Sequence, residues 1–142
     1  PADNDVQCLV RRAGDPTIVN VQRMNTKDRY RTGRYDLELL TLPRLRIPDV
    51  VIEQSATAPV RIPQSGILNV RSTTPCIGAV LHVKGDELEW VLDLDPTLSL
   101  QQVRLLPGEY KLVMRPQRAT ETALSQEKSF AIQSGVPTNI DL

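Results

Sequence analysis

Apolar and polar residues alternate along much of this chain, and Gly and Pro separate the short apolar runs. Within 35–39 the apolar residues are separated by Asp36 and Glu38, and 109–115 shows a similar alternation. A period of two is typical of a β-strand with one buried face and one face in water. Further strands are expected near 6–12, 17–23, 50–53, 59–62, 66–71, 76–83, 88–94, 98–104, 130–133 and 138–142.

Gly and Pro mark the ends of the two clearest strands. Gly33 and Gly108 precede them, where a turn requires a backbone conformation that glycine tolerates. Pro43 and Pro116 follow, and proline cannot donate to a strand ladder. Two hairpins are also expected, one joining 50–53 to 59–62 and the other joining 130–133 to 138–142. The polar stretch 117–127 is expected to be a long loop or to hold one helical turn.

The chain contains an internal repeat. Gly-Arg-Tyr-Asp-Leu-Glu-Leu at 33–39 is echoed 75 residues later by Gly-Glu-Tyr-Lys-Leu-Val-Met at 108–114. Residues 10–15 resemble 81–86 at an offset of 71, and 50–62 match 130–142 at an offset of 80. The offset grows only across loops, where insertions are tolerated. The sequence therefore predicts two copies of one fold, 1–64 and 65–142.

Short strands with turn signals between them predict an all-β protein of two tandem antiparallel Greek-key β-sandwiches. One difference separates the copies, because the second has a strand at 66–70 before the strand that holds Cys76. The first copy has only Pro1–Asp5 before the strand that holds Cys8. We therefore expect the first copy to lack its first strand, which would precede Pro1 in a parent protein. Its exposed edge is a route to self-association.

Composition argues against several functional classes. The chain has 17 basic and 17 acidic residues, which gives no support to nucleic-acid binding. No apolar run approaches the roughly 18 residues that span a bilayer, so we expect no membrane insertion. Cys8 and Cys76 do not form a disulfide framework, and they occupy roughly equivalent positions in different copies. We expect two buried free thiols.

The repeat resembles a known group of β-sandwiches. Leu-Leu-Pro-Gly-Glu-Tyr at 105–110 is similar to a strand of carboxypeptidase-regulatory-like, prealbumin-like and related Ig-like domains. Residues 6–11, 33–43 and 127–130 resemble the C-terminal tandem repeats of bacterial (Bacteroidetes) von Willebrand factor A domain proteins. The resemblance implies a non-catalytic module of the periplasm or cell surface. The Asp-x-Ser-x-Ser metal motif of the A domain is absent from the chain, so no family ligand site transfers to it.

The acidic residues around Trp90 are the candidate metal ligands. Glu89, Asp93 and Asp95 could supply part of a calcium shell, which requires six to eight oxygens. The competing interpretation places Leu88, Trp90 and Leu92 on a buried face and leaves the acids in solvent.

Few residues qualify for other chemistry. His82 lies in a predicted strand and is expected to face outward, without the nucleophile and orienting group that a general base needs. Tyr30 lies among Arg29, Arg31 and Arg34, a cluster that is suited to an anion or a base but is also common in solvated loops. Trp90 and Tyr30 are the aromatic residues left for a glycan platform.

The sequence thus predicts no catalytic site and no cofactor. It favours a structural or adhesive module that spaces or presents a protein partner or an adjacent domain, such as a von Willebrand A-like domain. A glycan- or calcium-binding module is the alternative, and an accessory domain of a peptidase or an outer-membrane receptor is a third.

Overall fold

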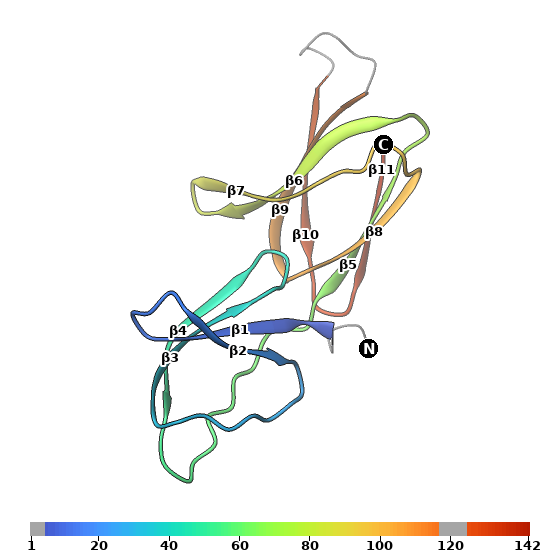
Figure 1. Cartoon of the computed structure of the whole chain (residues 1–142). Helices are drawn as coiled ribbons and strands as arrows, with labels where there is room; N and C mark the ends of the chain where they lie inside the picture. Colours follow the sequence, from blue (N-terminus) through green and yellow to red (C-terminus); the bar gives the residue numbers. More distant parts are fainter. Residues whose placement is uncertain (1–4, 117–124) are drawn as a thin grey trace. The chain divides into compact units, whose positions relative to one another are not determined.

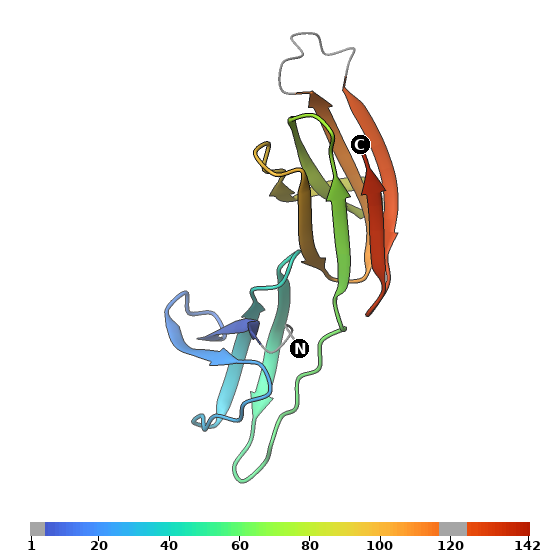
Figure 2. The same ribbon diagram turned by 90° about the vertical axis from the view of Figure 1, so that its right-hand side faces the viewer.

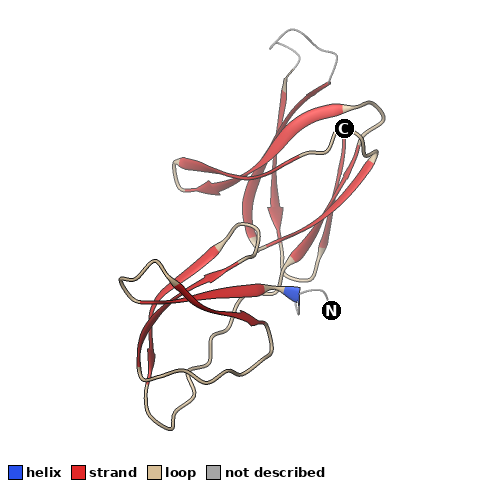
Figure 3. Ribbon diagram, in the orientation of Figure 1, coloured by secondary structure: helices blue, strands red, loops and turns tan. Residues whose placement is uncertain are grey.

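A computed structural model describes residues 5–116 and 125–142, which form eleven β-strands and no α-helix (Figures 1 and 3). The short blue segment before β1 in Figure 3 is a 3₁₀ turn at Asp5. The chain divides into two compact units, Pro1–Ile62 and Pro63–Leu142, which we call unit 1 and unit 2. Most of the segment expected to be a loop or a helical turn, 117–124, lies outside the described residues.

Unit 1 contains one four-stranded antiparallel sheet. Its strands are β1 (Gln7–Arg12), β2 (Ile18–Arg23), β3 (Gly33–Leu39) and β4 (Leu45–Ile52), in the order β2-β1-β3-β4. After β4 the chain continues through 53–65 without a strand, drawn as loop in Figure 3. The prediction of a strand at 59–62, and of the hairpin that joins it to 50–53, is therefore wrong. The strand expected at 50–53 begins earlier, at Leu45.

Unit 2 contains two sheets. They have the orders β10-β9-β6-β7 and β11-β5-β8. The strands are β5 (Gly66–Arg71), β6 (Cys76–Lys84), β7 (Glu87–Asp93), β8 (Leu100–Leu105), β9 (Gly108–Pro116), β10 (Gln126–Ile132) and β11 (Pro137–Asp141). One cluster of buried apolar side chains draws on both sheets, among them Leu68, Val80 and Leu112. This arrangement is consistent with a β-sandwich.

The hairpin expected at the end of unit 2 does not form. β10 pairs with β9, whereas β11 crosses to the other sheet and runs parallel to β5. Figure 2 shows β5 and β11 side by side and pointing the same way. The prediction of antiparallel strands is therefore correct for every other pair of strands in the described ranges but wrong for this one.

The sheet of unit 1 has the same order as the four-stranded sheet of unit 2, with β1, β2, β3 and β4 in the places of β6, β7, β9 and β10. Val10 lies opposite Leu37 in the first sheet, and Val80 lies opposite Leu112 in the second. The offset between β1 and β6 is thus 70 rather than 71. By this register Cys8 corresponds to Gly78, so its expected equivalence with Cys76 is wrong.

A tyrosine fixes the same corner in both units. The hydroxyl of Tyr35 donates to the carbonyl of Arg31 at 2.7 Å, and that of Tyr110 donates to the carbonyl of Leu106 at 2.5 Å. Each acceptor lies four residues upstream of its tyrosine. In unit 1, Gly33 lies between Arg31 and Tyr35 and has a φ of +153°. Through these hydrogen bonds the two tyrosines anchor equivalent loops to their sheets.

The hydrophobic core is concentrated in unit 2. Unit 1 contributes Val10, Tyr35 and Leu39 to the buried apolar side chains of the described residues. Unit 2 contributes twelve, namely Leu68, Val70, Val80, Val91, Leu94, Leu105, Leu106, Tyr110, Leu112, Met114, Ile132 and Ile140. Unit 1 has one sheet in the described ranges, so its apolar face is covered only in part, whereas the two facing sheets of unit 2 bury both inner faces.

Candidate functional site

A polar hollow of about 490 Å³ lies in unit 1, beside the segment between β2 and β3. It is lined by Arg12, Val19, Asn20, Asp28, Arg29, Tyr30, Arg31 and Tyr35. Three arginines against one aspartate make the lining positive, as suits an anion. The hollow is therefore a candidate anion site of unit 1.

The side chain of Tyr30 is fixed inside this hollow. Its hydroxyl donates to Gln22 Oε1 at 2.7 Å and accepts from Asn20 Nδ2 at 2.8 Å. Its ring meets the edge of Tyr35 at a centroid distance of 5.4 Å. Burial raises the pKa of Tyr30 above its ordinary value. Both the hydroxyl and the ring serve the fold of unit 1, which leaves little of Tyr30 for a ligand.

The structure brings together part of the predicted arginine cluster. Arg29 and Arg31 line the hollow with Tyr30, but Arg34 instead pairs with Asp49 at 3.1 Å. Arg12 joins the lining from β1, and sequence reasoning missed it. The signal was weak because Arg12 reaches the hollow only through the β1–β3 ladder, where it lies opposite Tyr35.

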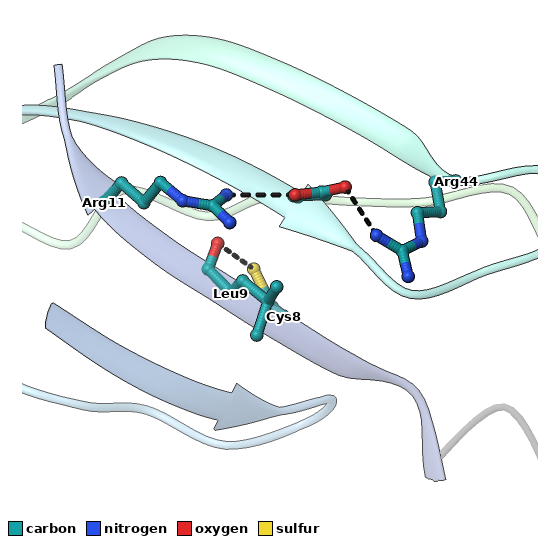
Figure 4. Close-up of polar contacts among 5 residues, drawn as sticks. Cys8, Leu9, Arg11 and Arg44 are labelled. Carbon is teal, nitrogen blue, oxygen red and sulfur yellow. Dashed lines mark hydrogen bonds and ion pairs between the residues drawn. The ribbon is translucent and has the colours of Figure 1, made fainter. Parts of the chain in front are cut away.

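Glu38 forms a buried ion-pair cluster on β3. It was expected in water, yet only 8% of its surface is exposed, because Arg11 and Arg44 cover it. Arg11 donates to Glu38 at 2.9 Å and Arg44 at 3.1 Å, and Figure 4 shows the two guanidinium groups on opposite sides of the carboxylate. These hydrogen bonds, led by that from Arg11, hold the pKa of Glu38 below its usual range.

This cluster predicts an acid-dependent stability of unit 1. A carboxylate with a depressed pKa stabilises the fold fully above its unfolded pKa and loses that contribution as pH falls through the folded pKa. We expect the wild-type unit 1 to lose stability more steeply than Glu38→Gln between about pH 5 and about pH 3. Amide exchange of β3 measures this effect, with Glu53→Gln at an exposed site as control. Equal slopes for all three proteins would contradict the prediction.

The structure does not assemble the candidate calcium ligands into one site. Glu89 pairs with Lys84 at 2.8 Å, and Asp93 accepts the indole N–H of Trp90 at 2.9 Å. Asp95 accepts from the backbone and side chain of Thr97, whose side-chain hydrogen bond is the main cause lowering its pKa. In the ranges 5–116 and 125–142, no group of three His, Cys, Asp or Glu residues is placed to hold a metal ion.

His82 does not face outward as the sequence predicted. It lies opposite Tyr110 in the ladder, and the two ring centroids are 5.0 Å apart. Its Nδ1 is buried without a hydrogen bond and lies 3.9 Å from Glu89 Oε2. His82 therefore packs on the core tyrosine of unit 2.

An apolar surface covers the outer face of β6 and β7. Leu81 lies opposite Trp90 and Val83 opposite Leu88, on the face away from Val80. Trp90 is 60% exposed and Leu88 is 51% exposed. The interpretation that these two side chains are buried is therefore wrong. A bulge between Val80 and Leu81 shifts the alternation of β7, so that Val91 is buried instead.

Both cysteines are free and half-buried. The Sγ of Cys8 lies 3.8 Å from the carbonyl of Leu9, and burial raises the pKa of its thiol (Figure 4). Cys76 lies 3.3 Å from the hydroxyl of Ser72. The expectation of free thiols agrees with the structure, but their burial is only partial.

Comparison with family models, curated proteins and solved structures finds no match for this chain. Among the described residues, no helix has the length and apolar character needed to cross a membrane.

Proposed function

We propose that this chain is a non-catalytic structural or adhesive module that spaces or presents a partner domain. The observation that carries the proposal is the repeated sheet. The pair β1–β3 has the same register as the pair β6–β9, with a tyrosine corner and a glycine at equivalent positions. What the two units repeat is a set of core and turn residues. Such residues position a fold, and no pair of reactive groups recurs with them.

The finer architecture belongs to the same proposal. Unit 2 is assigned as a Greek-key, prealbumin-like sandwich, since its chain crosses repeatedly between two sheets that share one apolar core. Unit 1 is assigned as a second copy of which one sheet is present. The resemblance to repeats that follow bacterial von Willebrand factor A domains supports an extracytoplasmic place beside such a domain.

The chemistry of His82 provides the test of the non-catalytic role. The acid 3.9 Å from its Nδ1 is Glu89, which also pairs with Lys84, and its ring is packed on Tyr110. We expect no turnover when the protein is incubated with a panel of esters, peptides, glycosides and phosphate esters. Turnover that is abolished by His82→Ala but kept by the surface variant Lys84→Ala would overturn the proposal.

A glycan-binding role is the second candidate, and the exposure of Trp90 favours it. An exposed indole on an edge strand offers the flat apolar face that stacks on a sugar ring. If this role is correct, a glycan array should show binding that Trp90→Ala removes at least about tenfold, a loss of about 1.4 kcal/mol. Tyr30→Phe, inside the hollow of unit 1, is the control and should bind normally. Binding that survives Trp90→Ala would exclude this surface.

A further inference from the structure

The two units differ at one place in the repeated fold. In unit 2, β5 lies at the centre of the smaller sheet and pairs with β11 on one side and β8 on the other. The offsets of 80 and 75 place 57–62 and 25–30 of unit 1 at the positions of β11 and β8. Neither segment of unit 1 forms a strand, and no strand pairing in the described ranges joins them.

The apolar face of unit 1 is correspondingly more open. Leu112 and Ile132 of unit 2 are 0% and 3% exposed. Their ladder equivalents, Leu37 and Ile52, are only half-buried. The same holds for 57–62, the segment at the position of β11, because Val60 is half-buried while its counterpart Ile140 is buried. These half-buried side chains are those that a central strand of a second sheet would cover.

The backbone of 57–62 is suited to receive such a strand. In unit 2 the N–H of Leu142 donates to the carbonyl of Arg71 at 2.8 Å, so the N–H of Leu142 points at β5. The backbone N–H groups of a strand point alternately to its two sides, so the N–H of Ile140 also points at β5 and that of Asn139 points away. By the offset of 80, Val60 and Ile62 face the open position in unit 1.

The proline in this segment fits the same register. Pro59 takes the place of Asn139, which faces away from β5. Proline is tolerated at an edge when its nitrogen is not required by the ladder. The side chains of Ala58, Val60 and Ile62 alternate with exposed ones, as they do in a strand.

We propose that unit 1 accepts one extended β-strand from a polypeptide segment outside these 142 residues, lying parallel to 58–62 and covering Leu37, Ile52 and Val60. The donor has apolar side chains at alternate positions, as β5 has at Leu68 and Val70. The β5 strand of a second copy is not the donor, because β5 is paired along both edges and its two apolar side chains are fully buried. This mode is strand addition, in which backbone hydrogen bonds give affinity and alternate side chains give specificity.

The inference identifies a binding partner by its chemistry and does not depend on the spacer role. A catalytic activity would overturn the proposed function and leave the strand position untouched. Failure to bind a strand would leave the non-catalytic role standing. The two proposals therefore fail separately.

The experiment uses the full chain and a synthetic peptide with the sequence of residues 64–72, Gln-Ser-Gly-Ile-Leu-Asn-Val-Arg-Ser. We expect the peptide to bind one site and to slow amide exchange at 58, 60 and 62, with chemical-shift changes at Leu37 and Ile52. A control peptide with aspartate in place of Leu68 and Val70 should bind at least about tenfold more weakly, because both apolar contacts are lost.

Two proline variants of the protein provide the matched comparison. Val60→Pro removes an N–H that faces the open position and should weaken peptide binding about tenfold or more. Arg61→Pro removes an N–H that faces away and should leave binding within about twofold, since no ladder bond depends on it. Neither change disturbs an existing strand, because 53–65 contains none.

Three results would overturn the proposal. One is the absence of protection at 58–62 at millimolar peptide. Another is loss of amide protection in β5 of the protein itself, which would mean that the peptide replaces β5 in unit 2. The third is a stable dimer of the free protein in which 58–62 is already protected, which would make a second copy the donor.

Discussion

Replacing Leu112 by alanine is expected to lower the free energy of unfolding of unit 2 by about 2 to 5 kcal/mol. Leu112 is completely buried at the centre of β9, between Val80 on β6 and the strand β10. Its truncation removes apolar contacts and leaves a cavity that the two sheets cannot close without moving. Amide exchange of β9 and β6 under increasing denaturant measures the loss.

The matched control is Leu37→Ala in unit 1. Leu37 holds the same ladder position on β3 but is only half-buried, so solvent already contacts part of its side chain. We expect a loss of about 0.8 to 1.5 kcal/mol in unit 1, half the transfer free energy of a leucine. Equal losses for the two variants would show that unit 1 buries its apolar face as fully as unit 2, contrary to the structure.

Gly78→Ala is expected to destabilise unit 2 by about 1 to 3 kcal/mol or more. A Cβ at Gly78 would overlap the carbonyl oxygen of Val113 and approach the Cα of Met114 to 2.9 Å. Both contacts are with the backbone of β9, so relief requires β6 and β9 to separate. The midpoint of thermal unfolding, followed by the fluorescence of Trp90, reports on this sheet.

Unit 1 offers the control for this substitution, since Cys8 occupies the position of Gly78. A side chain is already accommodated there, and Cys8→Ala removes only one half-buried sulfur atom. We expect its cost to stay below about 1 kcal/mol. If Gly78→Ala proved as mild as Cys8→Ala, the close approach of β6 to β9 would be wrong.

The sequence predicted the strands better than their partners. Period-two alternation identified β3 and β9, because one face of each is covered and the other carries charges. It assigned the segment after β10 to a hairpin, yet β11 pairs in parallel with β5, more than sixty residues earlier. Alternation records which side of a strand is apolar, and it holds no information about which strand lies alongside.

Errors at candidate sites have local causes. Trp90 and Leu88 were assigned to a buried face because a regular alternation places them with Leu92, but the bulge beside Val80 interrupts that register. Such a bulge adds one residue without a sequence signature of its own. Glu38 was assigned to water, and only the ladder reveals that Arg11 and Arg44 can reach it from β1 and from the loop before β4.

The sequence predicted only some of the residues that line the hollow of unit 1. Arg29, Tyr30 and Arg31 are neighbours in sequence, so their clustering was visible. Arg12 and Asn20 come from β1 and β2, and their approach to Tyr30 depends on the pairing of those strands. Residues brought together by a sheet are found from its register and cannot be found from spacing alone.

Amide hydrogen exchange along the whole chain tests the central claim, that unit 1 repeats one sheet of unit 2 without its second sheet. The structure predicts slow exchange in β1 and β3, matching β6 and β9, together with fast exchange throughout 57–62. The alternate amides 138, 140 and 142, which point at β5, are predicted to exchange slowly, because β5 pairs with them. Protection of 57–62 equal to that of β11 in the free monomer would contradict the account, as would rapid exchange in β3.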